Sequence, residues 1–217
     1  MPVLPKLLIW DWNGTILDDT DLCLRIENEL LTERGMRPVT KAWYLANFSF
    51  PIRAYYERMG MGYTFGTESD FDVSAQFMER YTARCPECGL REGVRNVLSE
   101  ARARGIAQTL LSVTEQSELR IEAARSGVAG FFSEIIGTDD ALGFSKVDRA
   151  KAYMARIGID PHDALFVGDT DHDVEAANAV GCACVLLEGG HQSRERLLQC
   201  GVPVYASADA LYRALFG

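Results

Sequence analysis

Short apolar runs alternate with segments of helical periodicity over most of this chain. The first run, residues 7–10, is followed by a polar turn and then by residues 21–34, where apolar side chains recur at helical spacing. Beyond residue 88 the alternation is regular, with strand-like runs at 106–111, 132–136, 164–167 and 182–187 and helical patterns at 93–104, 115–125, 147–157 and 173–180. Gly105, Gly127 and Gly158 each fall just beyond a helical pattern, where a residue in the left-handed backbone conformation commonly ends a helix. The order predicts an α/β fold, a doubly wound parallel sheet with helices on both faces.

One early segment departs from this pattern. Between about residues 38 and 83 the chain is rich in aromatic side chains, is interrupted by proline and glycine, and has no strand-like run. We interpret it as a small helical insertion, with a core of residues 1–15 and 89–217 and an inserted domain of residues 16–88. After residue 187 the pattern predicts only short helical or irregular stretches.

The acidic composition narrows the classes of partner. The 217 residues include 22 Lys and Arg against 31 Asp and Glu, a formal net charge of −9. Phosphate backbones select for basic surfaces, so this balance argues against a nucleic-acid-binding protein. No apolar run of about 18 residues is present, and the first residues lack the basic and then apolar pattern of an export signal. We expect a cytoplasmic protein without a membrane or nucleic-acid partner, either a monomer or a homodimer.

Six cysteines, at residues 23, 85, 88, 182, 184 and 200, allow more than one interpretation. Cys85 and Cys88 have the spacing of half a zinc site or of a redox pair. The strand and helix that usually surround a redox pair are missing from this segment. We therefore favour a loop at this point and reduced cysteines that mostly serve as small core residues.

Polar residues follow three of the predicted strands. They are Asp-Trp-Asn-Gly-Thr at 11–15, Ser-Val-Thr at 112–114 and Gly-Asp-Thr-Asp-His-Asp at 168–173. The carboxyl ends of parallel strands line one crevice, so Asp11, Ser112, Asp169 and Asp173 are expected to meet there. Carboxylates this close repel unless a cation neutralises them, and an all-oxygen set suits Mg²⁺ better than zinc. Lys146, at the start of a helical pattern, would add a positive charge.

These segments resemble, in order, the four motifs of the haloacid dehalogenase (HAD) superfamily. The resemblance covers the core, about two thirds of the chain, and the insertion is similar to the helical cap of phosphoglycolate phosphatase-like members. It implies a Rossmann-like core and a phosphatase that acts on a small phosphorylated metabolite. It also implies the following roles: Asp11 as the nucleophile that forms an aspartyl-phosphate, Ser112, Val113 and Lys146 as phosphate-binding groups, and Asp11, Asn13, Asp169 and Asp173 as the Mg²⁺ site.

Asn13 departs from the pattern of the phosphatases in that superfamily, which have an aspartate at this position. The resemblance gives that aspartate two jobs, a backbone carbonyl that binds Mg²⁺ and a side chain that moves protons. Asn13 keeps the carbonyl but cannot act as an acid or base, because an amide does not titrate in the useful range. Loss of a general acid or base typically costs roughly 10²–10⁴ in rate.

Four interpretations follow. The first is a slow or specialised Mg²⁺-dependent phosphatase whose leaving group needs little protonation or finds a proton on a neighbouring group. The second is a phosphonatase-like or other HAD hydrolase; a Schiff base would then need Lys41, the only lysine between residues 16 and 145. The third is a catalytically weak protein that binds a phospholigand. The fourth is deamidation of Asn13-Gly14, which would restore an acid in a fraction of molecules.

The insertion also offers candidates for substrate specificity. Arg53, Tyr55 and Tyr56 belong to a helical segment that begins near Pro51, and we expect them to reach toward the crevice. An arginine there would hold a carboxylate or a second phosphate through two hydrogen bonds. The two segments that join the insertion to the core, near residues 16–19 and 84–90, would let it open and close.

Overall fold

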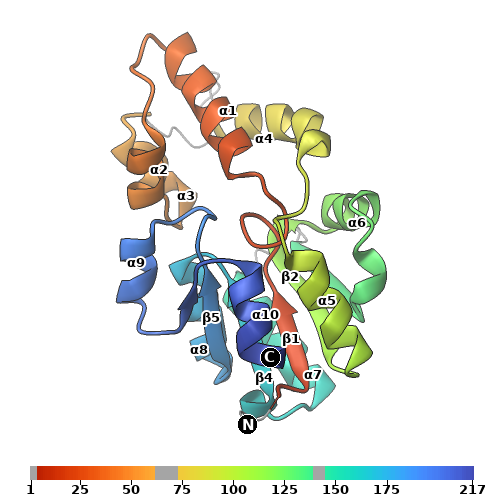
Figure 1. The fold of residues 1–217 in the computed structure, drawn as a ribbon. Coiled ribbons are helices and arrows are strands. Elements are labelled where there is room, and N and C mark those ends of the chain that lie inside the picture. Colours follow the sequence, from red (N-terminus) through yellow and green to blue (C-terminus); the bar gives the residue numbers. More distant parts are fainter. Residues whose placement is uncertain (1–3, 62–72, 139–144) are drawn as a thin grey trace.

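A single parallel sheet forms the base of the molecule (Figure 1). The computed structural model describes residues 4–61, 73–138 and 145–217. The strands are β1 (Leu7–Trp10), β2 (Ala107–Glu115), β3 (Glu134–Thr138), β4 (Ala164–Gly168), β5 (Ala183–Leu187) and β6 (Val204–Tyr205). All of their pairings are parallel, in the order β3-β2-β1-β4-β5-β6. This is the doubly wound order of Rossmann-like folds, so the predicted fold class is confirmed.

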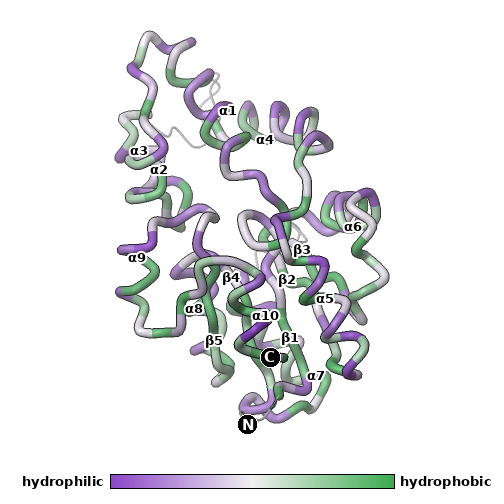
Figure 2. The backbone as a smooth tube through the Cα atoms, in the orientation of Figure 1, coloured by the Kyte–Doolittle hydropathy of each residue, from purple (hydrophilic) through white to green (hydrophobic). Residues whose placement is uncertain are grey.

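Helices cover both faces of this sheet. They are α5 (Val94–Ala103), α6 (Gln116–Arg125), α7 (Lys146–Ile157), α8 (Asp171–Val180), α9 (Arg194–Gln199) and α10 (Ala208–Phe216). Side chains of successive strand residues point to opposite faces, so Leu8 and Trp10 join a core with α5, α6 and α10, while Leu7 and Ile9 join one with α7, α8 and α9. Strands buried on both faces read as continuous apolar runs, and Figure 2 colours β5 green accordingly.

Three strands differ from the sequence prediction. β3, predicted at residues 132–136, spans Glu134–Thr138. β6 was not predicted, because two half-buried residues at the edge of a sheet leave no periodic signal. β2 continues past its apolar run through polar residues to Glu115, which pairs with Thr138 beyond a shift in register. The predicted helix ends are confirmed: Gly105, Gly127 and Gly158 all have positive φ angles.

The insertion forms a helical layer above the carboxyl ends of the strands (Figure 1). Its helices are α1 (Thr20–Glu33), α2 (Lys41–Asn47), α3 (Ile52–Arg58) and α4 (Val73–Arg84), and they enclose a hydrophobic cluster of their own. Residues 62–72, with three of the aromatic side chains noted above, lie outside the described residues. The two connecting segments run side by side, because the backbone N–H of Asp18 donates to Gly89 and that of Arg91 donates to Ile16.

The cysteines behave mostly as core residues. All six are free thiols, and Cys23, Cys85, Cys182 and Cys184 are buried. Within the described parts of the chain, Cys85 and Cys88 belong to no group of three or more metal-ligand side chains. Among those same residues, no helix combines the length and apolar character needed to span a lipid bilayer.

Candidate active site

The strand ends bring three buried carboxyl groups together. Asp11 directly follows β1, Asp169 directly follows β4, and Asp173 lies in the first turn of α8. Their carboxylate oxygens lie within 4.8 Å of one another, although Asp11 is far from the other two in the sequence. The carboxyl ends of neighbouring parallel strands therefore meet here as the pattern predicts.

Lys146 connects two of these carboxyl groups. Its Nζ donates to Asp11 Oδ1, and it donates to Asp173 Oδ1 at 2.6 Å. The lysine is only 3% exposed because it is the first residue of α7, where Ser145 and Asp148 form a capping box that fixes the start of the helix. Lys151, the other lysine of α7, is exposed. The position at the helix start thus aims one ammonium group into the cluster.

The charges of this cluster do not balance by themselves. Three ionised carboxylates and one ammonium leave two negative charges in a site where each side chain is nearly inaccessible to water. An oxygen-only set of this charge fits a hard divalent cation, so the three aspartates could hold a metal ion. Asp169 is already oriented, because its two oxygens accept from the Thr15 hydroxyl and the His191 backbone N–H, both at 2.7 Å.

The pKa values differ among the three acids. Burial raises the pKa of Asp11 to about 8, with the nearby Asp173 and Asp169 opposing the effect of Lys146. Burial likewise raises the pKa of Asp169. Burial also disfavours ionised Asp173, but the Lys146 ammonium and the Thr170 hydrogen bonds lower its pKa. A divalent cation would favour the ionised form of all three groups.

Two glycines allow this close packing. A Cβ atom at Gly168 would lie 2.1 Å from Asp173 Cγ, and one at Gly190 would lie 2.2 Å from Asp169 Oδ2. Any larger residue would push a carboxylate out of the cluster. The absence of a side chain at both positions therefore leaves room for the carboxyl groups of Asp173 and Asp169.

Asn13 is fixed by three side chains. Its Nδ2 donates to Asp19 Oδ2 at 2.8 Å and to the Tyr81 hydroxyl at 2.7 Å, and its Oδ1 accepts from the Thr114 hydroxyl at 2.9 Å. The amide orientation follows from Asp19, whose carboxylate accepts but does not donate. Ser112 Oγ in turn contacts the Thr114 hydroxyl and backbone N–H, both at 3.1 Å.

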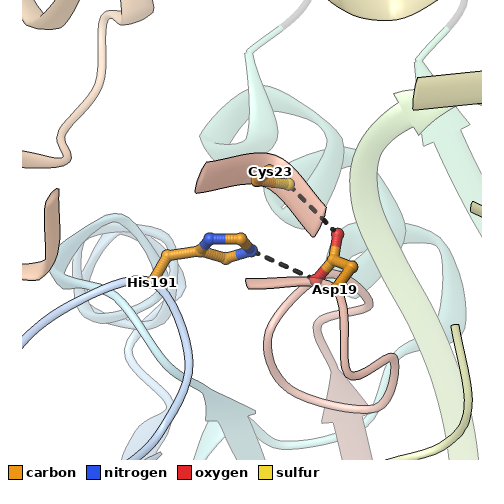
Figure 3. Close-up of side chains that lie close together, drawn as sticks. All are labelled: Asp19, Cys23 and His191. Carbon is orange, nitrogen blue, oxygen red and sulfur yellow. Dashed lines mark hydrogen bonds and ion pairs between the residues drawn. The ribbon is translucent and has the colours of Figure 1, made fainter. Parts of the chain in front are cut away.

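Asp19 is the centre of a second buried cluster (Figure 3). Besides Asn13, its carboxylate accepts from the Gly14 backbone and the Tyr81 hydroxyl, both at 2.8 Å, and contacts the Cys23 thiol at 3.7 Å. His191 Nε2 lies 3.3 Å from Asp19 Oδ1. Burial opposes both charges, yet the histidine lowers the pKa of Asp19, and the carboxylate raises the pKa of His191 to about 9. The pair is therefore ionised at neutral pH.

A cavity of about 360 Å³ opens between the insertion and the strand ends. Asp11, Asn13, Val113 and Lys146 line its floor, whereas Ser112 lies behind Thr114. Asp169 and Asp173, the other candidates for the metal site, do not line the cavity. Asp173 accepts from Lys146 and Asp169 accepts from the backbone of His191, and both of these donors line it.

The three specificity candidates of α3 have different positions. Tyr56 lines the cavity. Tyr55 does not line it, but its hydroxyl donates at 2.7 Å to Glu27, which does. Arg53 is on the outer surface, where it pairs with Glu57 at 3.0 Å, and its side chain is 54% exposed.

Sequence reasoning missed Asp19 and His191 as parts of the site. Both line the cavity and are buried. A signal for His191 existed: it follows the end of β5 by four residues, and the rule applied to the other strands covers this strand end too. Asp19 had no comparable signal, because it follows no strand directly and two of its partners, Tyr81 of α4 and His191 of the loop after β5, are distant in the sequence.

Comparisons with known proteins find similar sequences and a similar fold. The sequence model of the family described as haloacid dehalogenase-like hydrolase matches residues 8–187. The chain is 26% identical to a phosphoglycolate phosphatase of Synechococcus elongatus, over 89% of this chain and 88% of the relative. It is 30% identical to a phosphoglycolate phosphatase of Pseudomonas fluorescens, over 87% of this chain and 71% of the relative. The crystal structure of a predicted phosphatase from Clostridium acetobutylicum shares the fold, with a TM-score of 0.80 at 18% identity over 98% of this chain and 99% of that one.

Proposed function

The chain belongs to the haloacid dehalogenase-like hydrolases, and from that premise we propose that it is a Mg²⁺-dependent phosphatase acting on a small phosphorylated substrate through a covalent intermediate on Asp11. The observation that carries this proposal is the buried contact of Lys146 with both Asp11 and Asp173 at the floor of the cavity. The curated relatives named as phosphoglycolate phosphatases support the reaction class.

Each residue at the floor has a chemical role in this proposal. A carboxylate oxygen of Asp11 attacks phosphorus as the bond from phosphorus to the ester oxygen breaks, and that oxygen leaves with the electron pair, so that one difficult displacement becomes two easier ones. Lys146 offsets negative charge on the transferring phosphoryl oxygens and the backbone at Val113 orients them, while Ser112, behind Thr114, positions this segment through its hydrogen bonds to Thr114. Water then attacks phosphorus, which releases phosphate and restores the Asp11 carboxylate.

The acidic cluster suits Mg²⁺. Carboxylates of Asp11, Asp169 and Asp173, directly or through water, and the backbone carbonyl of Asn13 would hold the ion. When bound, it supplies positive charge that neutralises the carboxylates and the substrate phosphate.

Asn13 makes this a phosphatase without the usual acid at that position. Its amide is held by Asp19, Tyr81 and Thr114, so it orients neighbours but transfers no proton. The proposal therefore predicts slow turnover of substrates whose leaving group must be protonated.

The alternative chemistry on a lysine has no support from the fold. Lys41 pairs with Asp21 at 2.6 Å, its side chain is 52% exposed, and it does not line the cavity. A Schiff base at Lys41 would form outside the cavity, away from Asp11. Deamidation of Asn13-Gly14 stays a further alternative. A protein that binds a phospholigand without turnover is distinguished from an enzyme by measuring turnover.

The test measures phosphate release from phosphoesters with Mg²⁺ for wild type, Asp11→Asn and Asp21→Asn. Asp21 is a matched control, because its side chain is 73% exposed. We expect multiple turnovers for wild type and Asp21→Asn and none for Asp11→Asn. Mass spectra of the quenched wild-type reaction should show one added phosphoryl group, absent from Asp11→Asn. Full activity of Asp11→Asn would refute the covalent route, and binding without turnover by wild type would favour the phospholigand protein.

A further inference from the structure

Aromatic side chains of the insertion form the wall opposite the acidic floor of the cavity. The residues concerned are Tyr44, Phe48, Phe50, Tyr56, Phe77 and Tyr81. Several of their rings pack against each other, with Tyr44 stacked on Phe48 at 5.4 Å and Phe77 on Tyr81 at 5.8 Å between centroids. The wall is therefore a largely apolar surface of the same cavity that Asp11 lines.

The described residues of this wall include no lysine or arginine that could bind a second anionic group of a substrate, and the ring of His172, which also lines the cavity, packs against Phe50 with 4.6 Å between centroids. Among the described residues that line the cavity, Lys146 is the only lysine or arginine, and Asp11 and Asp173 engage its ammonium. The imidazole of His191 is likewise engaged, by Asp19 and by the Tyr44 hydroxyl. The sequences of residues 62–72 and 139–144 contain no Lys, Arg or His. A carboxylate such as that of phosphoglycolate would lose its water without gaining a lysine or arginine partner.

The chemistry at residue 13 points to the same class of substrate. Asn13 cannot protonate a departing oxygen, so residue 13 favours a group that can leave as an anion. A phenol has a pKa of about 10, whereas an alcohol is a far weaker acid, with a pKa close to that of water. A phenolate therefore leaves far more readily than an alkoxide when no acid is present.

We propose, resting on the phosphatase function above, that this site is built for aryl phosphate monoesters, with the ring held against the aromatic wall and the phosphate on the floor beside Asp11 and Lys146. The bond from Asp11 to phosphorus forms as the bond from phosphorus to the aryl oxygen breaks. The electron pair of the broken bond leaves with that oxygen, and the phenolate takes its proton from bulk water. Water then releases phosphate from Asp11.

The dimensions agree with this assignment. A cavity of about 150 Å³ suffices for a benzene molecule, and this one measures about 360 Å³ and so has room for one ring and a phosphate. Aromatic rings in contact favour offset or edge-to-face packing, which the wall can offer to a further ring.

The first experiment compares kcat/KM for substituted phenyl phosphates, glycerol phosphate and phosphoglycolate, with wild type and Asp11→Asn. We expect kcat/KM for phenyl phosphate to exceed the values for both alkyl esters at least 100-fold, and to rise as the phenol becomes more acidic. Equal or faster cleavage of phosphoglycolate would overturn the aryl assignment and leave the phosphatase function standing. No Asp11-dependent turnover of any ester would overturn the phosphatase function itself.

The second experiment changes the wall at exposed positions, where the fold tolerates substitution. Phe50 and Met78 line the cavity and are 37% and 43% exposed. Phe50→Ala should raise KM for phenyl phosphate several-fold and leave acetyl phosphate unaffected. Met78→Lys should raise kcat/KM for phosphoglycolate at least tenfold while lowering it for phenyl phosphate. Leu198, which is 54% exposed and outside the cavity, supplies the controls Leu198→Ala and Leu198→Lys. Unchanged selectivity in both wall variants would overturn the role of the wall.

Discussion

Replacing Asn13 by aspartate tests how the site accommodates its unusual residue. The Asn13 Nδ2 that donates to Asp19 Oδ2 at 2.8 Å becomes a carboxylate oxygen facing another carboxylate. The donor to the Tyr81 hydroxyl is lost at the same time. We therefore expect Asn13→Asp to raise the pKa of the new acid and to destabilise the fold whenever that acid is ionised.

The size of the effect follows from the distance. Two unit charges about 3 Å apart repel by about 6 kcal/mol at an effective dielectric constant of about 20. Residue 13 is half-buried, so solvent screening reduces this to roughly 2–3 kcal/mol. In the unfolded chain an aspartate ionises above about pH 4, while the folded variant holds its proton to a higher pH. The loss of stability should therefore be small near pH 4, grow as the pH rises, and level off above the raised pKa.

Urea unfolding of wild type and Asn13→Asp between pH 4 and 8 measures this difference directly. Asn96→Asp is the matched control, because Asn96 is exposed on α5 and should show no such trend. In Asn13→Asp/Asp19→Asn the repulsion is removed, so the double variant should lose less stability than the sum of the two single variants. A pH-independent loss, or additive single losses, would refute the electrostatic reasoning. In its protonated form, the carboxyl group that Asn13→Asp introduces should also speed cleavage of alkyl phosphates roughly 100-fold, with the gain disappearing at high pH.

Three further predictions concern the charges around the cavity. Lys146→Met should cost about 3–5 kcal/mol of folding free energy without Mg²⁺, because it leaves buried carboxylates uncompensated, while the exposed Lys151→Met should cost almost nothing in the same urea titration. The pKa of His191 is raised from 6.5 to about 9, so the ion pair with Asp19 contributes about 3 kcal/mol to the free energy of unfolding below pH 6.5, and this contribution disappears as the pH rises to 9. His191→Gln should remove that pH dependence of the unfolding free energy. An unchanged slope would contradict the pairing. Mg²⁺ should raise the melting temperature of wild type but not of Asp169→Asn, as calorimetry with and without a chelator would show.

Most of the fold was accessible from the sequence because buried parallel strands are continuous apolar runs. Leu7–Trp10 and Ala164–Gly168 are of this kind and are buried on both faces. The sequence pattern does not identify a strand where residues pair in the sheet but are polar or only half-buried. The second half of β2 is polar but still pairs with β3, and Val204–Tyr205 is half-buried at the edge of the sheet. Neither feature leaves a periodic pattern to detect.

The sequence did not show which side chains of α3 face the cavity. Arg53 and Tyr56 are three residues apart on α3, yet Arg53 pairs with Glu57 at the surface while Tyr56 lines the cavity. Both side chains suit a binding site chemically. Which of them faces the floor depends on how α3 packs on the rest of the insertion, and that packing involves residues distant in the sequence.

Asn13, the residue that departs from the motif, interacts with Asp19, which a search by motif does not find. An amide there donates to Asp19 and accepts from Thr114 at once, whereas an ionised carboxylate cannot donate. Asp19 in turn is ionised because it neutralises His191 and accepts from the Gly14 backbone. An acid at position 13 therefore conflicts with an acid at position 19, and a neutral amide resolves the conflict. The two positions act as a pair, so restoring an aspartate at 13 should yield a stable acid catalyst only when residue 19 is changed with it.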